Sequence, residues 1–181
     1  MSAAKEASRY ILDRVARMLE SGDASVDDAV AAIRSAQRVF VYGVGRSGLV
    51  ARAFAMRLVQ LGLECYFIGE TITPIVRAGD LVVIVSNTGS TMSAVQTANI
   101  ARRVGAGVLS ITGNRASKLS QASNVTLTIS EAMDARRAKY APLGTLFETA
   151  ALILLDGIVA HVMKERGETE SSMRSRHAIM V

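Results

Sequence analysis

Short apolar runs alternate with longer segments of mixed polarity along most of this chain, and the alternation predicts a parallel sheet covered by helices. The short runs are rich in Val, Ile and aromatic residues, which is typical of strands. They are Arg38–Tyr42, Glu64–Ile68, Leu81–Val85, Val108–Thr112 and Val125–Ile129. Leu81–Val85 is apolar throughout, as expected for a central strand that is covered on both faces.

The segments between and after these runs have apolar residues at helical spacing. Four helices are predicted here, over Ser47–Leu61, Thr91–Val104, Ser117–Ala122 and Gly144–Arg166. Gly62 and Gly105 stand directly after the first two, where glycine ends many helices. Residues 131–142 form a predicted polar loop, and residues 168–176 are predicted to be helical before His177.

Two further helices are predicted ahead of the first strand. In the first, four residues form one apolar face: Ile11, Val15, Met18 and Leu19. The second runs from Ser25 to Arg34, and the Ser25 side chain is expected to cap it. Asp27 and Asp28 stand in its first turn, where negative charge is favourable.

The length of 181 residues corresponds to one domain. We divide it into N-terminal helices (1–37), an α/β core (38–166) and a tail (167–181) that contributes to the site. Strands joined by helices imply right-handed crossovers, and ligands of such sheets bind at the carboxyl ends of the strands. The loops to inspect therefore follow Tyr42, Val85, Thr112 and Ile129.

A single cysteine, Cys65, excludes an internal disulfide framework and a multi-cysteine metal site, and it fits a reducing cytoplasm. No secretory signal is visible at the N-terminus. The longest apolar stretch, Ala150–Ala160, is interrupted by Asp156 and Gly157. It is shorter than the ~20 residues that a membrane span needs, so we interpret it as a buried helix and expect no membrane association.

The formal net charge of +5 favours anionic partners, and nucleic acid is the first candidate. However, the basic residues are scattered along predicted helices. All four Phe lie in apolar runs, so no row of exposed rings offers bases a stacking surface. A small anionic substrate fits better than nucleic acid, although a charge of this size also serves solubility alone.

The turn after the first strand, Gly43-Val44-Gly45-Arg46-Ser47-Gly48, matches the G-x-G-x-x-G pattern of dinucleotide sites. Such a site needs an acidic residue at the end of the next strand to hold the ribose. Glu64 stands at the start of that strand, and Glu70 comes late, past its end. Nicotinamide binding is therefore the weaker interpretation.

The loop after the central strand, Ser86-Asn87-Thr88-Gly89-Ser90-Thr91, contains four hydroxyl side chains in six residues. It opens a helix, whose N-terminus offers unpaired N–H groups and a partial positive charge to an anion. The loop predicts a phosphate site that needs no lysine. The alternative is that Ser90 or Thr91 simply caps the helix.

Together, the two loops resemble the sugar isomerase domain family, known as SIS domains. The phosphosugar loop of that family runs Ser-x-Ser-Gly-x-Thr. Ser86, Gly89 and Thr91 match it, and Thr88 replaces the middle serine. The Gly-x-Gly-Arg-Ser turn and the following stretch at 54–58 also resemble the family. The resemblance implies a flavodoxin-like three-layer α-β-α sandwich around a five-stranded parallel sheet.

The segments 142–148 and 173–178 resemble the 6-phospho-3-hexuloisomerase branch, and the likeness extends over essentially the whole chain. One stretch departs from the branch, which usually has Gly-Ser-Gly-Glu where this chain has Asn87-Thr88-Gly89-Ser90. The resemblance implies interconversion of 3-hexulose 6-phosphate and fructose 6-phosphate through an enediol, in the ribulose monophosphate pathway. It also implies a homotetramer and no redox cofactor.

Such chemistry needs a general base beside the carbonyl and a group that moves protons between oxygens. Glu148 follows Phe147 in an apolar helix, where a carboxylate becomes a better proton acceptor; it would equally complement the helix dipole. The resemblance favours catalysis for Glu148, and for His177 a role in moving protons between oxygens or in opening the sugar ring. Without the resemblance, a histidine so near the C-terminus is expected to be a surface residue. His161 is taken as structural.

The turn after the first predicted strand supplies the remaining candidates, Gly45, Arg46 and Ser47. They would contact sugar hydroxyls or a developing oxyanion. Arg46 pairing with a surface acid is an equal alternative. One Cys and two His form no recognisable metal-ligand cluster, so no metal is expected.

Two other functions remain open. One is an isomerase of the arabinose 5-phosphate type, which shares the fold and the enediol. The other is a non-catalytic sugar-phosphate-binding module of a transcription regulator, although the first 37 residues lack an obvious basic recognition helix.

Overall fold

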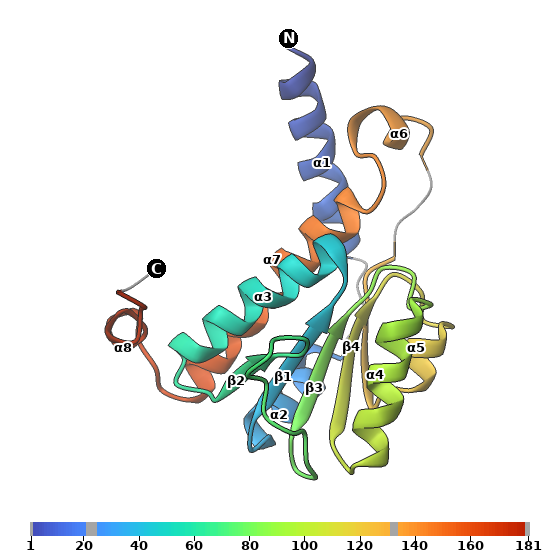
Figure 1. Cartoon of the computed structure of the whole chain (residues 1–181). Helices are drawn as coiled ribbons and strands as arrows, with labels where there is room; N and C mark the ends of the chain where they lie inside the picture. The colour runs from blue at the N-terminus through green and yellow to red at the C-terminus, as the bar shows by residue number, and fades with distance from the viewer. Residues whose placement is uncertain (1, 21–24, 131–133, 180–181) are drawn as a thin grey trace.

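The computed structural model describes residues 2–20, 25–130 and 134–179. Five parallel strands form one sheet in the order β2-β1-β3-β4-β5, which is the flavodoxin-like order (Figure 1). The strands are β1 (Val39–Gly43), β2 (Cys65–Phe67), β3 (Leu81–Val85), β4 (Gly107–Thr112) and β5 (Val125–Thr128). The prediction of a five-stranded parallel sheet is confirmed.

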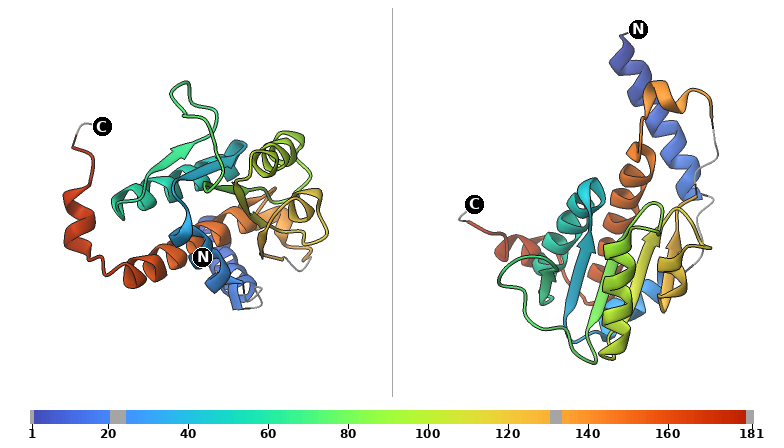
Figure 2. Two further views of the ribbon diagram at one scale, coloured as in Figure 1. Left: turned by 90° about the horizontal axis from the view of Figure 1, so that it is seen from below. Right: turned by 45° about the vertical axis from the view of Figure 1, so that its right-hand side comes forward.

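Eight helices are described, and most of them cover the two faces of the sheet. They are α1 (Ala3–Glu20), α2 (Val26–Ser35), α3 (Gly45–Gln60), α4 (Met92–Arg103), α5 (Lys118–Gln121), α6 (Arg137–Tyr140), α7 (Thr145–Glu165) and α8 (Glu170–Ser175). Seen from below, α4 and α5 lie on one side of the sheet, and α1, α2 and α7 on the other (Figure 2). The three-layer sandwich is therefore confirmed.

Each face of the sheet has its own apolar core, because successive strand residues point to opposite faces. Val39 and Val41 of β1 join the larger core with residues of α1, α2, α3 and α7. Phe40, between them, joins the smaller core with Ala94 and Ala98 of α4 and Leu119 of α5. The two helical layers thus pack independently on one sheet.

Helix α7 is the long apolar helix that the sequence predicts. It packs against α1, α2 and α3. By length and composition alone it meets the criteria for a membrane span, but half of its apolar window is buried inside the fold. Leu155, Ile158 and Val162 all lie in the larger core, which is the behaviour of a core helix.

Several local predictions are corrected. Ser25 stands at the N-cap of α2, but its side chain makes no capping hydrogen bond. The predicted strand Glu64–Ile68 shortens to the three residues of β2. The predicted polar loop 131–142, of which 131–133 lie outside the described residues, contains the short helix α6.

Helix α6 is stabilised by a contact that no local pattern reveals. The N-terminal half of α1 projects past the carboxyl edge of the sheet, and α6 lies beside it (Figure 1). The rings of Tyr10 and Tyr140 lie 5.5 Å apart, and the Tyr140 hydroxyl donates to Glu6 at 3.2 Å. Two segments distant in sequence therefore meet just ahead of α7.

The C-terminal tail is anchored at the far end of α3. The Arg176 guanidinium donates to the Glu168 carboxylate and to the Gln60 carbonyl at 3.1 Å. These bonds from Arg176, with one from Ser172, hold the pKa of Glu168 below its usual range. Thr169 caps α8 through a reciprocal bond with Ser172. The tail is thereby tied to its own chain up to Arg176.

Candidate active site

The hydroxyl-rich loop lies at the carboxyl end of the central strand, between Val85 and Met92. Ser86 is buried, and its hydroxyl donates to Thr91 at 3.4 Å. The Thr88 hydroxyl accepts from the backbone N–H and the hydroxyl of Ser90, at 3.3 and 3.0 Å. Thr91 occupies the N-cap of α4 without a capping side-chain bond. The hydroxyls therefore bond to one another instead of closing the helix end.

A small cavity of about 120 Å³ joins this loop to the first glycine turn. Its lining residues are Val44, Ser47, Val85, Ser86, Asn87, Thr88, Thr91 and Ala94. The first turns of α3 and α4 both contribute to it. Helix N-termini expose N–H groups and a partial positive charge, so the cavity is suited to an anion.

The loop after β4 holds the hydroxyl-rich loop in place. The Asn87 carbonyl accepts from the Gly113 N–H at 2.8 Å and from the Thr112 hydroxyl at 3.1 Å. The Gly89 carbonyl accepts from the Leu119 N–H at 3.0 Å. Gly89 has φ +60°, and a Cβ there would lie 2.1 Å from the Ser117 hydroxyl. Only glycine fits this close approach of two loops.

The glycines of the first turn are explained by backbone geometry. A Cβ on Gly48 would lie 2.6 Å from the Gly43 carbonyl oxygen, so both residues allow α3 to start directly on β1. Gly45 has φ +58°. Neither acid considered for a ribose lines the cavity: Glu64 accepts from the Tyr66 hydroxyl at 2.6 Å, and Glu70 pairs with an arginine of α3.

Glu148 is in the first turn of α7 and is 9% exposed. The sequence predicts apolar surroundings for its carboxylate, and this is corrected in part. The Arg46 guanidinium, in the first turn of α3, donates through Nε to Oε2 of Glu148. Arg46 thus pairs with a buried acid and not with a surface one. The carboxylate of Glu148 is therefore held by a charge-assisted hydrogen bond from the opposite helix.

The turn 43–47 connects this carboxylate to the cavity. Val44 and Ser47 line the cavity, and Arg46 contacts Glu148. The predicted residues of the two loops and Glu148 are therefore gathered at one edge of the sheet.

His177 is not brought to this edge within one chain. It is exposed and lines a separate cavity of about 420 Å³ with Arg57, Gln60 and residues of α8. A helix rises about 1.5 Å per residue, so Gln60 lies about 20 Å from Ser47 along α3. The tail of the same chain thus stands at the opposite end of α3 from the cavity.

The model of the SIS domain family matches residues 32–155. This chain belongs to the SIS domain family. It is 38% identical over 156 residues to a Methanocaldococcus jannaschii protein named 3-hexulose-6-phosphate isomerase, covering 84% of this chain and 82% of that protein. A Methylomonas aminofaciens protein with the same name is 30% identical over 171 residues, covering 93% and 94%.

A solved structure supports the same membership. It is a Methanococcus jannaschii protein for which a 3-hexulose-6-phosphate isomerase function was inferred. It is 31% identical, with a TM-score of 0.84, and the match covers 94% of this chain and 98% of that chain. The two relatives and this structure are each named for, or inferred to have, a sugar-phosphate isomerase activity, and the structure shares the fold found here.

The supporting residues of this SIS domain were not singled out by sequence reasoning. Thr112, Gly113 and Ser117 shape the hydroxyl-rich loop, and Gly144 adjoins Glu148. The sequence signals were that the loop after Thr112 follows a strand at the carboxyl edge, and that Gly144 lies in the segment 142–148 that carries the family resemblance. Within the described ranges, no group of three or more His, Cys, Asp or Glu side chains is placed to hold a metal ion.

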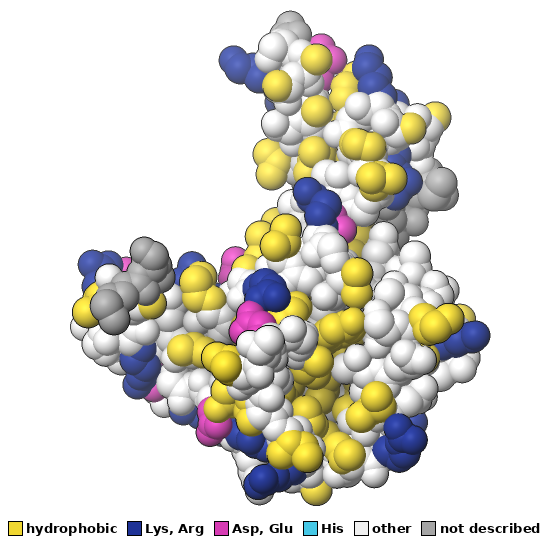
Figure 3. Space-filling view, viewed as in Figure 1, with side chains coloured by type: hydrophobic (Ala, Val, Ile, Leu, Met, Phe, Trp, Pro, Cys, Tyr) yellow, Lys and Arg dark blue, Asp and Glu magenta, His cyan; other side chains and the backbone are white. Residues whose placement is uncertain are grey.

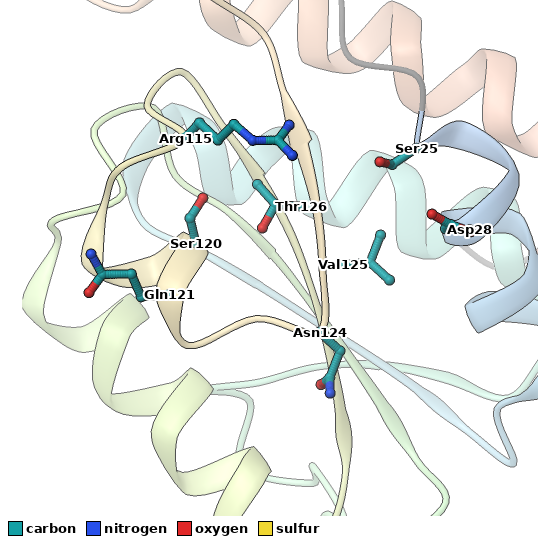
Figure 4. Close-up of a pocket in the computed structure, with 8 residues that line it drawn as sticks. All are labelled: Ser25, Asp28, Arg115, Ser120, Gln121, Asn124, Val125 and Thr126. Carbon is teal, nitrogen blue, oxygen red and sulfur yellow. The ribbon is translucent and has the colours of Figure 1, made fainter.

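Another pocket of about 320 Å³ lies at the β5 edge of this SIS domain, beside α2 and α5 (Figure 4). Its lining residues are Ser25, Asp28, Arg115, Ser120, Gln121, Asn124, Val125 and Thr126. It shares none of the predicted site residues. It is lined by acidic, basic and amide groups. Two helix N-termini converge on the smaller cavity, and they do not converge on this pocket.

Proposed function

We propose that this SIS domain interconverts 3-hexulose 6-phosphate and fructose 6-phosphate. The observation that supports this best is the connection of the hydroxyl-lined cavity, through the turn 43–47, to the buried carboxylate of Glu148. The first feature suits a phosphate, and the second suits the removal of a carbon-bound proton. Relatives that are 30 to 38% identical and named for this reaction support the same substrate.

The phosphate is held by Ser86, Thr88 and Thr91, with backbone N–H groups of the same loop. Asn87, Gly89 and Ser90 complete the loop around it. Gly45 and Ser47 of the opposite turn approach the sugar end. All of these contacts are neutral donors, and hydrogen bonds to a charged group contribute about 1.5–3 kcal/mol each.

The reaction moves a carbonyl between carbons 3 and 2. Glu148 removes the proton from the carbon beside the carbonyl, and the electron pair of that C–H bond forms the enediol. Protonation of the former carbonyl carbon, with transfer of the hydroxyl proton, restores a ketone at the neighbouring position. No electron leaves the substrate, so the chemistry needs no redox cofactor.

His177 performs its proton transfer between oxygens in the site of a neighbouring chain, since in its own chain it lines a cavity with Gln60, which lies about 20 Å from Ser47 along α3. A homotetramer in the cytoplasm fits this arrangement. Apolar side chains gather between α3 and α4 on the face shown in Figure 3. Exposed apolar side chains occur in α3, in α4 and in the loop before β3, and they include those of Met56, Ile72, Ile75 and Ile100.

The experiment that tests the proposal is NMR of the protein incubated with fructose 6-phosphate. The protein is first dialysed against a chelator, and no nicotinamide is added. Appearance of the 3-ketose supports the proposal. Conversion of arabinose 5-phosphate alone to its 2-ketose would replace it with the aldose–ketose alternative. Binding of either sugar phosphate without conversion would indicate a sensing module.

The role of Glu148 is tested with Glu148→Gln, which preserves the shape of the side chain and removes its basicity. Positioned proton transfer contributes about 10²–10⁴-fold, so kcat should fall by that order while substrate affinity changes little. Incorporation of deuterium from solvent into the substrate should stop. His177→Ala should slow turnover and retain part of the exchange. Normal exchange in Glu148→Gln would remove Glu148 from the base role.

A further inference from the structure

We infer that Gly144 and Arg46 are positioning residues that fix the direction of the Glu148 carboxylate. Arg46 holds one carboxylate oxygen, and Gly144 leaves the space that the other oxygen occupies. The inference rests on the proposed role of Glu148 as the base. It adds two residues, one in the first turn of α3 and one at the N-cap of α7, whose function is to position the carboxylate of that base.

The backbone at Gly144 does not require glycine. Its φ of −88° and ψ of 8° are accessible to any L-residue, and it stands at the N-cap of α7. The constraint comes from the side chain one turn later. A Cβ on Gly144 would lie 2.8 Å from Oε1 of Glu148, 3.0 Å from its carboxyl carbon and 3.3 Å from Oε2. The space beside Gly144 is therefore filled by the carboxylate itself.

The backbone of Glu148 belongs to the same turn, since its N–H donates to the Gly144 carbonyl at 2.9 Å. The Glu148 side chain thus lies directly against the backbone of Gly144. Any larger residue at 144 has to push the carboxylate away from this position, and the displacement acts on the contact that its other oxygen makes.

That other contact comes from Arg46. Its Nε donates to Oε2, while 63% of the Arg46 side chain is exposed and only 11% of the Glu148 side chain is. The buried partner is therefore fixed by a residue that reaches in from the open edge of the sheet. Because Oε2 is engaged by the guanidinium, Oε1 is the oxygen left to accept the proton.

The first test replaces Gly144 with alanine. A displacement of about 1 Å at a reacting group costs up to about 10²-fold in rate, so Gly144→Ala should lower kcat by ~10–100-fold. KM should change far less, because the phosphate loop is untouched. The matched control is Gly157→Ala in the same helix, where a Cβ meets nothing within 4 Å, and it should keep the wild-type kcat.

The second test compares Arg46→Gln with Arg46→Lys. Arg46→Gln removes the cation and should lower kcat about as much as Gly144→Ala. Arg46→Lys restores the charge without the guanidinium Nε and should recover part of the loss. Since the Arg46 side chain is largely exposed, these variants keep the inference testable even if Gly144→Ala does not fold.

A double-mutant cycle with Glu148→Gln distinguishes an effect on the position of the carboxylate from a general effect on the fold. Once the carboxylate is gone, neither Gly144→Ala nor Arg46→Gln should reduce kcat further. Full additivity, or wild-type kcat in both single variants, overturns the positioning role. If Glu148→Gln itself exchanges deuterium normally, the proposed base falls and the inference falls with it. If Glu148→Gln loses deuterium exchange while Gly144→Ala and Arg46→Gln keep it, Glu148 remains the base and only the positioning inference fails.

Discussion

At the scale of single residues, the hydroxyls of Ser86 and Thr88 are the proposed phosphate contacts to be tested first. Ser86 is buried beside the cavity, and Thr88 accepts two hydrogen bonds from Ser90. The double variant Ser86→Ala/Thr88→Ala should raise KM at least about tenfold, because each bond to a charged group contributes ~1.5–3 kcal/mol. Steady-state kinetics measure this.

Thr97→Ala is the control for that prediction. Its hydroxyl donates to the Ser93 carbonyl within α4 at 2.8 Å, and Thr97 is not among the residues that line the cavity, so KM should stay at the wild-type value. An unchanged KM and kcat/KM in the double variant would exclude the loop as the phosphate site.

The sequence predicted single residues well where the neighbours are local. Glu148 was expected in the first turn of a buried helix, and it is there. Its partner Arg46 is 102 positions away, and the two meet only because α3 packs on α7. Pattern and spacing carry no information on such a pair, so the sequence left Arg46 open between substrate and acid. The catalytic role of Glu148 stays a prediction.

At the scale of elements, two turns whose glycines have nearly the same φ angle offer a comparison. Gly45 and Gly89 have φ of 58° and 60°, but a Cβ meets nothing within 4 Å at Gly45 and meets Ser117 at 2.1 Å at Gly89. Gly45→Ala should cost only the left-handed strain of roughly 1–2 kcal/mol. Gly89→Ala should cost more, since overpacking adds about 1–3 kcal/mol.

Urea unfolding of the two variants measures the difference. The midpoint of Gly89→Ala should lie clearly below that of Gly45→Ala, with equal slopes. Equal midpoints would mean that the loop after β4 does not constrain the turn at Gly89.

The elements themselves were predicted to within a few residues wherever the apolar pattern is long. Strand β3, which is buried on both faces, was predicted with its observed bounds, and the bounds of β1 and β4 were predicted to within one residue. Strand β2 is shorter than expected because it is at the edge of the sheet and pairs only with β1. Helix α6 was missed because four residues show no periodicity and its support is the contact of Tyr140 with Tyr10.

At the scale of the whole molecule, a buried ion pair joins the amino ends of the two central strands. Arg38 donates to both oxygens of Asp80, at 3.0 and 2.6 Å, and the Arg77 N–H donates at 2.8 Å. Burial alone would raise the pKa of Asp80, but these donors outweigh it and hold the pKa below its usual value. Ionised Asp80 is therefore favoured in the fold.

A depressed carboxyl pKa gives stability that is present above its unfolded value of about 3.9 and is lost as the pH falls through the folded value. Asp80→Asn leaves Arg38 without its partner and should lower the free energy of unfolding at pH 7 by about 3 kcal/mol. The difference in the free energy of unfolding between Asp80→Asn and wild type should narrow below about pH 4. Urea unfolding from pH 7 to pH 3 measures it, and a gap independent of pH contradicts the assignment.

The control removes a pair on the surface. Glu170 and Arg174 form an exposed ion pair one turn apart in α8, and such pairs contribute little. Glu170→Gln should leave the unfolding midpoint unchanged at every pH in the same series.

The position of the tail was beyond sequence reasoning at this scale. The family resemblance gave His177 a role in the site, and the helical pattern of the tail is real. Where α8 stands, however, depends on the length of α3 and on the bonds of Arg176 to Glu168 and to the Gln60 carbonyl. These are properties of the assembled fold, so the distance between His177 and Glu148 is visible only in three dimensions.

The division of the interior into two cores has an evolutionary consequence. The loop proposed to hold the phosphate leads into α4 on one side of the sheet, and the Arg46–Glu148 pair belongs to α3 and α7 on the other. Substitutions in α7 and in the later turns of α3 therefore leave the packing of α4 behind that loop intact, whereas the first turn of α3 lines the same cavity. A lineage built on this scaffold is free to alter the α3–α7 side of the site while it inherits the α4 side unchanged.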